Sequence, residues 1–250
     1  MVSVYTFGDS MLDCGHYNAF GVNPGQLLVQ NDNRLFPEFR GHDLVSLGPA
    51  RLIHRAQDGA TVSNLPAQVR GLPVEGESIA LLTIGGNDLL SRPDMGQGAE
   101  TQRFAEALES FLQSLPIRPV FLGNVYDPTF GDDSFNFLDI EPSIAQQSHR
   151  ILNVVIAELA RRYGALVDLH THFLTGDPSW FAQIIEPSLR GASEIRRFFC
   201  ARCFRMCVIN GRSRQQRQRH YASQDLPYHT RQGWIVDRAE QALPTVSKKG

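Results

Sequence analysis

Ile79-Ala80-Leu81-Leu82-Thr83-Ile84-Gly85-Gly86-Asn87-Asp88 is the stretch of sequence that decides the fold. Its first six residues form an apolar run, which predicts a strand buried on both faces, as in a parallel sheet. Polar side chains follow directly after the glycines. Open α/β sheets build their sites at the carboxyl ends of the strands. We therefore expect residues 85–88 to belong to a functional site.

Further apolar runs along the chain predict four more strands, over residues 2–7, 50–56, 119–122 and 165–169. Between them, helical patterns cover residues 101–115 and 143–163. Alternating strands and helices predict an α/β fold in which helices cover both faces of a mostly parallel five-stranded sheet. Residues 21–41 show little periodicity, and we expect a long loop or a lid-like insertion there.

Two more motifs follow predicted strands: Gly8-Asp9-Ser10-Met11 and Asp58-Gly59-Ala60-Thr61. A serine hydroxyl becomes a nucleophile only when a base takes its proton, and the resulting oxyanion needs fixed donors. Ser10 fits the nucleophile. Gly59 offers a backbone N–H that a substrate can approach closely, because glycine has no Cβ, and Asn87 offers a side-chain amide. The ends of the predicted strands would bring these three residues to one rim.

The three motifs, in this order, resemble the blocks of the GDSL, or SGNH, hydrolases over residues 1–198. Residues 7–13 are similar to the first block, Gly59 fits the second, and residues 85–88 fit the third. The resemblance implies a flavodoxin-like three-layer α/β/α fold and hydrolysis of a carboxylic ester through a Ser10 acyl-enzyme, without a cofactor. It also implies an oxyanion hole made by the N–H groups of Ser10 and Gly59 and by the Asn87 side chain. We add Asp9 and Asn124 to the residues expected to line this site.

The fourth block of that family departs from its pattern here. The family has Asp-x-x-His-Pro, whereas this chain has Gln183 in place of the Asp and Glu186 in place of the His, with Pro187 retained. Gln183 cannot supply the charge that stabilises an imidazolium. Glu186 can act as the base if burial raises its pKa. Alternatively, the chain is a catalytically impaired SGNH-fold protein that binds a ligand without turnover.

A second source of the base is His170 or His172, in the run that ends the fifth predicted strand. The alternation of side chains along a strand would place both on one side, from which either could approach Ser10. The competing interpretation is that these residues close the strand, and a metal site there is weaker still. For other polar residues we expect structural roles. His54 is interpreted as a hydrogen-bonded structural histidine, and Asn124 and Asp127 are interpreted as turn caps.

The charge of the chain is unevenly distributed. Residues 1–197 carry 14 Arg and 23 acidic residues, a net charge of −9, whereas residues 198–250 carry a net charge of +7. We therefore divide the chain into a hydrolase-like domain over 1–198 and a basic, Arg-rich tail over 199–250. The tail is only a weak signal for nucleic acid, and solvation of its arginines is the simpler interpretation.

Without a leader or a run of apolar residues long enough for a membrane span, we expect a cytoplasmic protein that acts on a small-molecule ester.

Overall fold

The computed structural model describes residues 1–96, 98–132, 134 and 141–209. Backbone contacts divide the chain into one unit of Met1–Met206 and a second of Cys207–Gly250. The part of the expected basic tail that follows Ile209 lies outside the described residues. Within the described residues, no helix combines the length and the apolar character that crossing a membrane requires.

A single parallel sheet organises the first unit. Its strands are β1 (Val2–Gly8), β2 (Ala50–His54), β3 (Glu77–Thr83), β4 (Val120–Gly123) and β5 (Ala165–Val167), in the order β2-β1-β3-β4-β5. All four pairings are parallel. All five strands lie where the apolar runs predict them, and every residue of β1 is buried, as expected for a strand covered on both faces.

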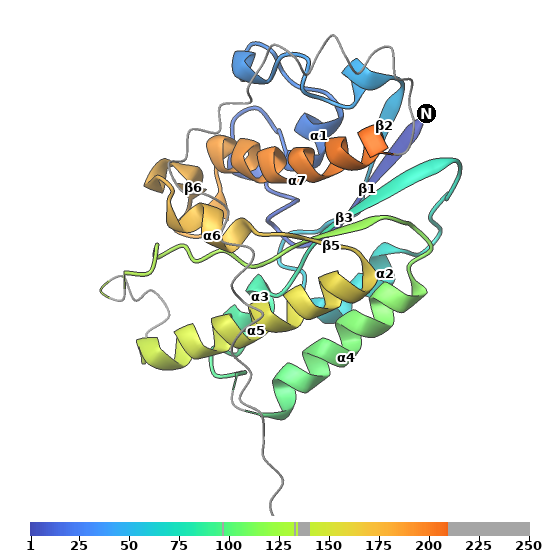
Figure 1. The fold of residues 1–250 in the computed structure, drawn as a ribbon. Coiled ribbons are helices and arrows are strands. Elements are labelled where there is room, and N and C mark those ends of the chain that lie inside the picture. Colours follow the sequence, from blue (N-terminus) through green and yellow to red (C-terminus); the bar gives the residue numbers. More distant parts are fainter. Residues whose placement is uncertain (97, 133, 135–140, 210–250) are drawn as a thin grey trace, which may run out of the picture. The chain divides into compact units, whose positions relative to one another are not determined.

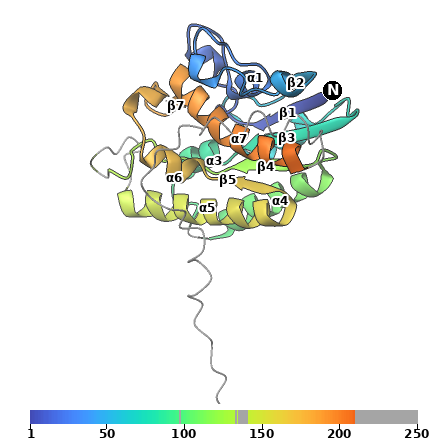
Figure 2. The same cartoon turned by 45° about the horizontal axis from the view of Figure 1, so that its top comes forward.

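Helices cover both faces of the sheet, which gives the predicted three layers. The helices α1 (Pro24–Val29) and α7 (Leu189–Ile209) lie on one face. The opposite face is covered by α2 (Leu65–Gln68), α4 (Ala99–Ser114) and α5 (Pro142–Tyr163), as Figures 1 and 2 show. Two short helices, α3 (Gly86–Ser91) and α6 (Leu169–Leu174), follow strands β3 and β5. A small hairpin of β6 (Phe181–Ala182) and β7 (Glu186–Pro187) precedes α7.

The main core lies between the sheet and helices α4 and α5. Both helices present apolar side chains at helical spacing, such as Phe104, Leu108 and Phe111 in α4. These pack against strand side chains that include Phe7 and Leu82. Burial of this continuous cluster fixes the sheet, and with it the positions of the loops that leave the strands.

The segment 21–41, expected as a long loop or a lid-like insertion, contains helix α1 and packs against the body of the molecule. Asn23 caps α1 by accepting a hydrogen bond from the Gln26 N–H, and the Gln26 side chain accepts one from the Asn23 N–H. Leu27, Phe36 and Phe39 then form a buried cluster. The segment is a packed part of the layer that contains α7.

Helix α7 runs through Phe198, so the expected boundary at residue 198 falls within a helix. Ile195, Phe199 and Cys203 are buried along it. Arg196 is buried too: it donates to the Asn31 Oδ1 at 2.9 Å and to the Ser193 Oγ at 2.7 Å. Its guanidinium lies 3.6 Å from the centre of the Phe39 ring. Burial lowers the pKa of Arg196 to about 10.

The histidines near β5 are in a helix, which corrects the expected strand alternation. β5 ends at Val167, and Asp168 caps α6 by accepting from the Thr171 N–H at 3.1 Å. Residues two apart in a helix point in different directions. His170 and His172 therefore do not share a side.

The carboxyl ends of the strands meet at one rim, where the polar motifs follow. Gly8 is level with Thr83, Thr83 with Gly123, and Gly123 with Val167. Gly8 has a φ of +110°, and a Cβ there would lie 1.6 Å from the Thr83 carbonyl oxygen. Only glycine fits this turn, which directs the chain from β1 to Ser10.

Candidate functional site

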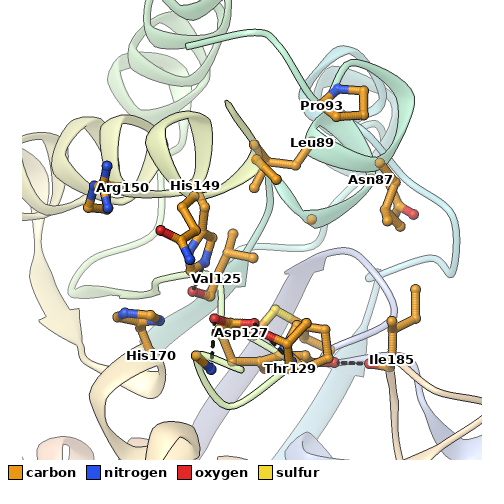
Figure 3. Close-up of a pocket in the computed structure, with 18 of the residues that line it drawn as sticks. Asn87, Leu89, Pro93, Val125, Asp127, Thr129, His149, Arg150, His170 and Ile185 are labelled. Carbon is orange, nitrogen blue, oxygen red and sulfur yellow. Dashed lines mark hydrogen bonds between the residues drawn. The ribbon is translucent and has the colours of Figure 1, made fainter. Parts of the chain in front are cut away.

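A cavity of about 380 Å³ opens at this rim and contains the expected nucleophile. Ser10, Asn87 and Glu186 line it, together with residues 125–129, 131 and 132 and the side chains of α3 and α5 that face it. Figure 3 shows Asn87 and Ile185 on one side of the cavity and His149, Arg150 and His170 on the other. The cavity has the size of a typical small-molecule site.

Ser10 lies in a tight turn that its neighbour Asp9 holds in place. The Asp9 Oδ1 accepts hydrogen bonds from the Met11 N–H at 3.2 Å and from the Thr83 hydroxyl at 2.8 Å. Ser10 is 8% exposed, and its backbone N–H has no hydrogen bond within the part of the chain that the structure describes. This N–H is therefore available to an oxyanion.

Gly59 and Asn87 meet at the turn that follows β2. Gly59 has a φ of +73°, and among the described residues nothing accepts its N–H. The Asn87 amide donates to the Ala60 carbonyl at 3.1 Å. Because an amide nitrogen carries two hydrogens, this bond anchors Asn87 beside Gly59 and leaves its second N–H for a ligand.

Glu186 lies beside the Ser10 side chain. It begins β7 and lines the cavity. Burial raises the pKa of Glu186, the neighbouring Ser10 hydroxyl lowers it, and the negative charge of the nearby Asp58 raises it. Its Oε2 is buried and has no hydrogen-bond partner among the described residues. A carboxylate in this position can take the Ser10 proton.

The loop before Glu186 has an unusual backbone. Gln183 and Ile184 both have positive φ, of 48° and 79°, and both side chains are exposed. A branched residue such as Ile184 rarely adopts this conformation. The Tyr126 hydroxyl donates to the Ile185 carbonyl at 2.5 Å, which ties the loop to the segment after β4. Sequence reasoning missed this contact of Tyr126, because nothing local marks it.

The two candidate histidines have different surroundings. His170 lines the cavity, and its ring lies 4.8 Å from that of His149 in an edge-to-face arrangement. His172 is not among the lining residues; its Nε2 lies 2.9 Å from the Glu194 Oε2, and its ring stacks on Trp180. Of these two histidines, only His170 therefore shares a cavity with Ser10.

Asn124 and Asp127 both serve as structural caps. The Asn124 amide donates to the Asp168 Oδ1 at 2.9 Å, and its oxygen accepts from the His170 N–H at 2.9 Å. Asn124 does not line the cavity. Asp127 does, and its carboxylate accepts from the N–H groups of Thr129 and Gly131.

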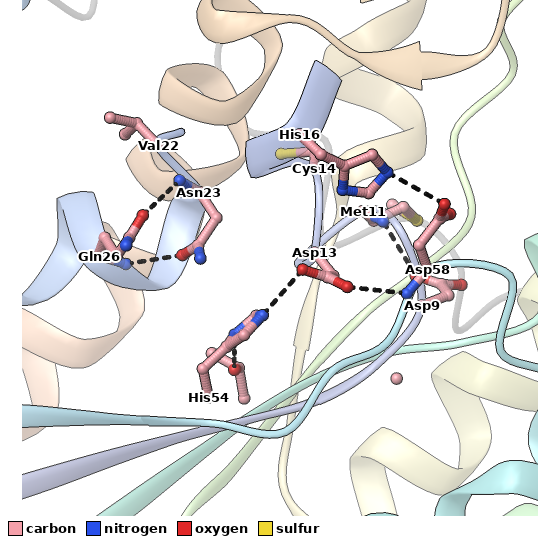
Figure 4. A network of polar contacts seen from close by, with 12 residues as sticks. Asp9, Met11, Asp13, Cys14, His16, Val22, Asn23, Gln26, His54 and Asp58 are labelled. Atoms are coloured by element: carbon pink, nitrogen blue, oxygen red, sulfur yellow. Dashed lines mark hydrogen bonds and ion pairs between the residues drawn. The ribbon is translucent and has the colours of Figure 1, made fainter. Parts of the chain in front are cut away.

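A network of polar side chains supports the Ser10 turn from behind (Figure 4). His54 binds Asp13 at 3.0 Å and the Thr6 hydroxyl at 2.7 Å, which confirms its structural role. Asp13 in turn accepts from the Asp58 N–H. Asp58 pairs with His16 at 3.1 Å, so an acid–histidine pair lies close to Glu186.

Two buried carboxyl groups next to the motifs are hard to ionise. Burial raises the pKa of Asp9 from 3.8 to about 7, and its Oδ2 has no partner among the described residues. Burial likewise raises the pKa of Asp88 to about 6, although the Val62 N–H donates to this carboxylate. Within the described residues, no group of three or more potential ligands is placed to hold a metal ion.

The comparisons with known proteins agree with the fold. The sequence model of the GDSL-like lipase/acylhydrolase family matches residues 6–192. A search of curated proteins found no match.

Solved structures of esterases share the fold at low sequence identity. Axe2, an acetylxylan esterase from Geobacillus stearothermophilus, superposes with a TM-score of 0.55 at 18% identity, over 79% of this chain and 91% of that one. A lipase/acylhydrolase from Enterococcus faecalis gives a TM-score of 0.56 at 16% identity, over 81% and 95% of the two chains.

Proposed function

Because the chain belongs to the GDSL-like lipase/acylhydrolase family, we propose that it hydrolyses carboxylic esters with Ser10 as nucleophile and Glu186 as base. The observation that carries the proposal is that the Glu186 carboxyl lines the same cavity as Ser10 and lies close enough for the Ser10 hydroxyl to lower its pKa. Glu186 therefore places a proton acceptor next to the nucleophile, in a block that lacks the family's histidine.

The reaction follows from these positions. Glu186 takes the Ser10 proton as Oγ attacks the carbonyl carbon of the ester. The oxyanion is held by the N–H groups of Ser10 and Gly59 and by the free N–H of Asn87. Collapse of the tetrahedral intermediate returns the proton from Glu186 to the departing alcohol. Water, deprotonated by Glu186, then attacks the acyl-enzyme and releases the acid and Ser10.

A carboxylate is a weaker base than an imidazole, so its surroundings matter. Burial raises the pKa of Glu186 and makes it a better acceptor. Protonated Glu186 is neutral, so it gains no ion-pair stabilisation of the kind that Asp gives to a protonated histidine. We therefore expect slow turnover, with the oxyanion hole as the main source of rate enhancement.

The test is hydrolysis of p-nitrophenyl butyrate by the wild type and by Ser10→Ala, Glu186→Gln and His170→Phe. We expect the first two variants to lose most turnover and His170→Phe to keep it. A fluorophosphonate should also add once to the wild type, at Ser10, in intact-mass analysis. An inactive His170→Phe beside an active Glu186→Gln would transfer the base to His170.

The alternative is a binding protein that keeps the pocket without turnover. The replacement of the family's Asp by the exposed Gln183 favours it. It predicts that wild type and Ser10→Ala bind an ester equally well while neither releases product or reacts with the fluorophosphonate.

A further inference from the structure

The cavity beside Ser10 has a mainly apolar wall and one polar side. The apolar residues come from α3, the segment after β4, α6 and the loop before β7: Leu89, Leu90, Pro93, Val125, Leu174 and Ile185. The polar side consists of His149 and Arg150 on α5 and His170 on α6, across the cavity from Asn87 in Figure 3. A ligand that spans this cavity from Asn87 to the opposite side therefore meets both apolar groups and these polar side chains.

The surroundings of His170 determine which of its two ring nitrogens carries the proton. Its Nδ1 is enclosed and has no hydrogen-bond partner among the described residues. An N–H at that place would be a buried donor without an acceptor, which is costly. The neutral ring therefore carries its proton on Nε2.

The Nε2 of His170 is the atom left to meet a ligand. It is not among the enclosed, unpartnered atoms, and the described residues offer it no hydrogen bond. The ring is held in place: its backbone N–H is bound by Asn124, and His149 packs against its face. His149 cannot take the same role, because its Nε2 is bound to the Val125 carbonyl at 2.8 Å.

The charges around the cavity favour an uncharged partner for this N–H. Asp127, Asp132 and Glu186 line the cavity, whereas Arg150 is the permanent cation among the lining residues. Hydrogen bonds from Ser134 lower the pKa of Asp132, so this carboxylate is ionised at neutral pH. The negative potential of these groups opposes an anionic ligand.

We propose that His170 determines specificity: its Nε2–H donates to an uncharged oxygen, such as a ketone, ether or hydroxyl, several carbons from the ester group of the substrate. This inference rests on the proposed esterase function and names its substrate class. The preferred ester has one arm that is aliphatic near the ester and carries an acceptor oxygen further out. Without that oxygen, the His170 N–H loses its bond to water and gains nothing in return.

The experiment compares matched esters that differ in one oxygen. p-Nitrophenyl hexanoate and p-nitrophenyl 5-oxohexanoate vary the acyl arm, and hexyl acetate and 5-oxohexyl acetate vary the alcohol arm. We expect the wild type to prefer the ketone in one of the two series by roughly tenfold in kcat/KM, the scale of one buried hydrogen bond. His170→Phe keeps a ring and loses the donor, so its preference should vanish. His172→Phe, the same change outside the cavity, should retain it.

Each result has a defined meaning. Equal rates for ketone and alkane in both series, or an unchanged preference in His170→Phe, would overturn the proposal. So would a wild type that prefers p-nitrophenyl hydrogen glutarate, whose carboxylate replaces the ketone. If the wild type hydrolyses no ester, the proposed function fails instead, and the specificity is then tested by calorimetric Kd values of the ester pairs for Ser10→Ala and for Ser10→Ala/His170→Phe.

Discussion

At the scale of single residues, the carboxylate beside Ser10 gives the reaction its own pH dependence. Glu186 accepts a proton only when ionised, and burial raises its pKa above the ordinary 4.5. We expect kcat/KM to rise with pH through a midpoint above 4.5. Asp58→Asn removes a neighbouring negative charge that raises the pKa of Glu186, so it should move the midpoint to lower pH. A pH profile that is identical in both proteins would contradict this coupling.

Asp9 links protonation to stability. Its pKa is about 7 in the folded protein against 3.8 ordinarily, so the folded state holds the proton more tightly. The resulting stabilisation is complete below pH 3.8 and is lost as the pH rises towards 7. Asp9→Asn is uncharged at all pH values. In urea unfolding, the free energy of unfolding of the variant should therefore rise relative to that of the wild type as the pH increases between these values, by roughly 4 kcal/mol at most. A difference in the free energy of unfolding between the two proteins that stays constant with pH would contradict the raised pKa of Asp9.

In the proposed mechanism, Asn87 contributes a donor that acts on the transition state. Asn87→Ala should lower kcat by roughly a hundredfold or more and leave KM nearly unchanged, because the amide is aimed at the oxyanion. The variant also loses the bond to the Ala60 carbonyl, so Tm must be measured alongside. Ser91→Ala is a matched control, since it removes a hydrogen bond of the same helix to the Asn87 carbonyl. Full activity in a folded Asn87→Ala would exclude Asn87 from the mechanism.

Ser10, Gly59 and Asn87 are identifiable from sequence because each sits in a short motif directly after a strand. Glu186 can be named from its alignment with the fourth block, but its contact with Ser10 depends on how the hairpin folds. The proposed role of His170 depends on a buried ring nitrogen, Nδ1, that has no hydrogen-bond partner among the described residues. No local sequence pattern reveals this. Sequence therefore identifies the groups, and the structure alone supplies their partners.

At the scale of elements, the hairpin that carries Glu186 depends on Tyr126. The Tyr126 hydroxyl binds the Ile185 carbonyl, next to the base, across a loop with two residues of positive φ. We expect Tyr126→Phe to lower kcat roughly tenfold, because a misplaced base costs rate, while KM changes little. The pH midpoint should shift too, since the burial of Glu186 changes. A KM effect with an unchanged kcat would instead make Tyr126 a substrate contact.

The strands and the helices α4 and α5 could be predicted because apolar periodicity reports burial directly. The short helices α1 and α6 lack this periodicity, and their sequence signals are caps instead. Asn23 and Gln26 form a capping box around Pro24, a pattern that predicts α1. Asp168 similarly caps α6, and without that signal residues 168–172 resemble the end of a strand. Capping is local chemistry, so these two errors could have been avoided from sequence.

At the scale of the whole molecule, Arg196 joins α7 to the packed segment 21–41. It is buried, yet no carboxylate pairs with it among the described residues. Arg196→Ala leaves a cavity and removes the donors that bind Asn31 and Ser193. We expect a loss of about 3 kcal/mol in the free energy of unfolding in urea. Arg190→Ala, an exposed arginine of the same helix, should stay within roughly 0.5 kcal/mol. Equal effects would contradict this role of Arg196.

The extent of α7 was harder to predict than the sheet. Polar and basic residues increase after Phe198, which hides the buried stripe of Ile195, Phe199 and Cys203. Charge composition marks a change of surface, whereas helical spacing marks what is buried. The division of the chain at residue 198 relied on the first of these, and α7 continues past that point to Ile209.

The hydrogen bond between Asn31 and Arg196 joins residues 165 positions apart, and this has a consequence for synthesis on the ribosome. The cluster of Leu27, Phe36 and Phe39 is made early, but the helix that covers it emerges near the end of the described chain. Until then these aromatic rings stay exposed to water and to other nascent chains. Such long-range closure slows folding, so this layer completes only after α7 has been synthesised, and its apolar side chains are open to non-native contacts until then.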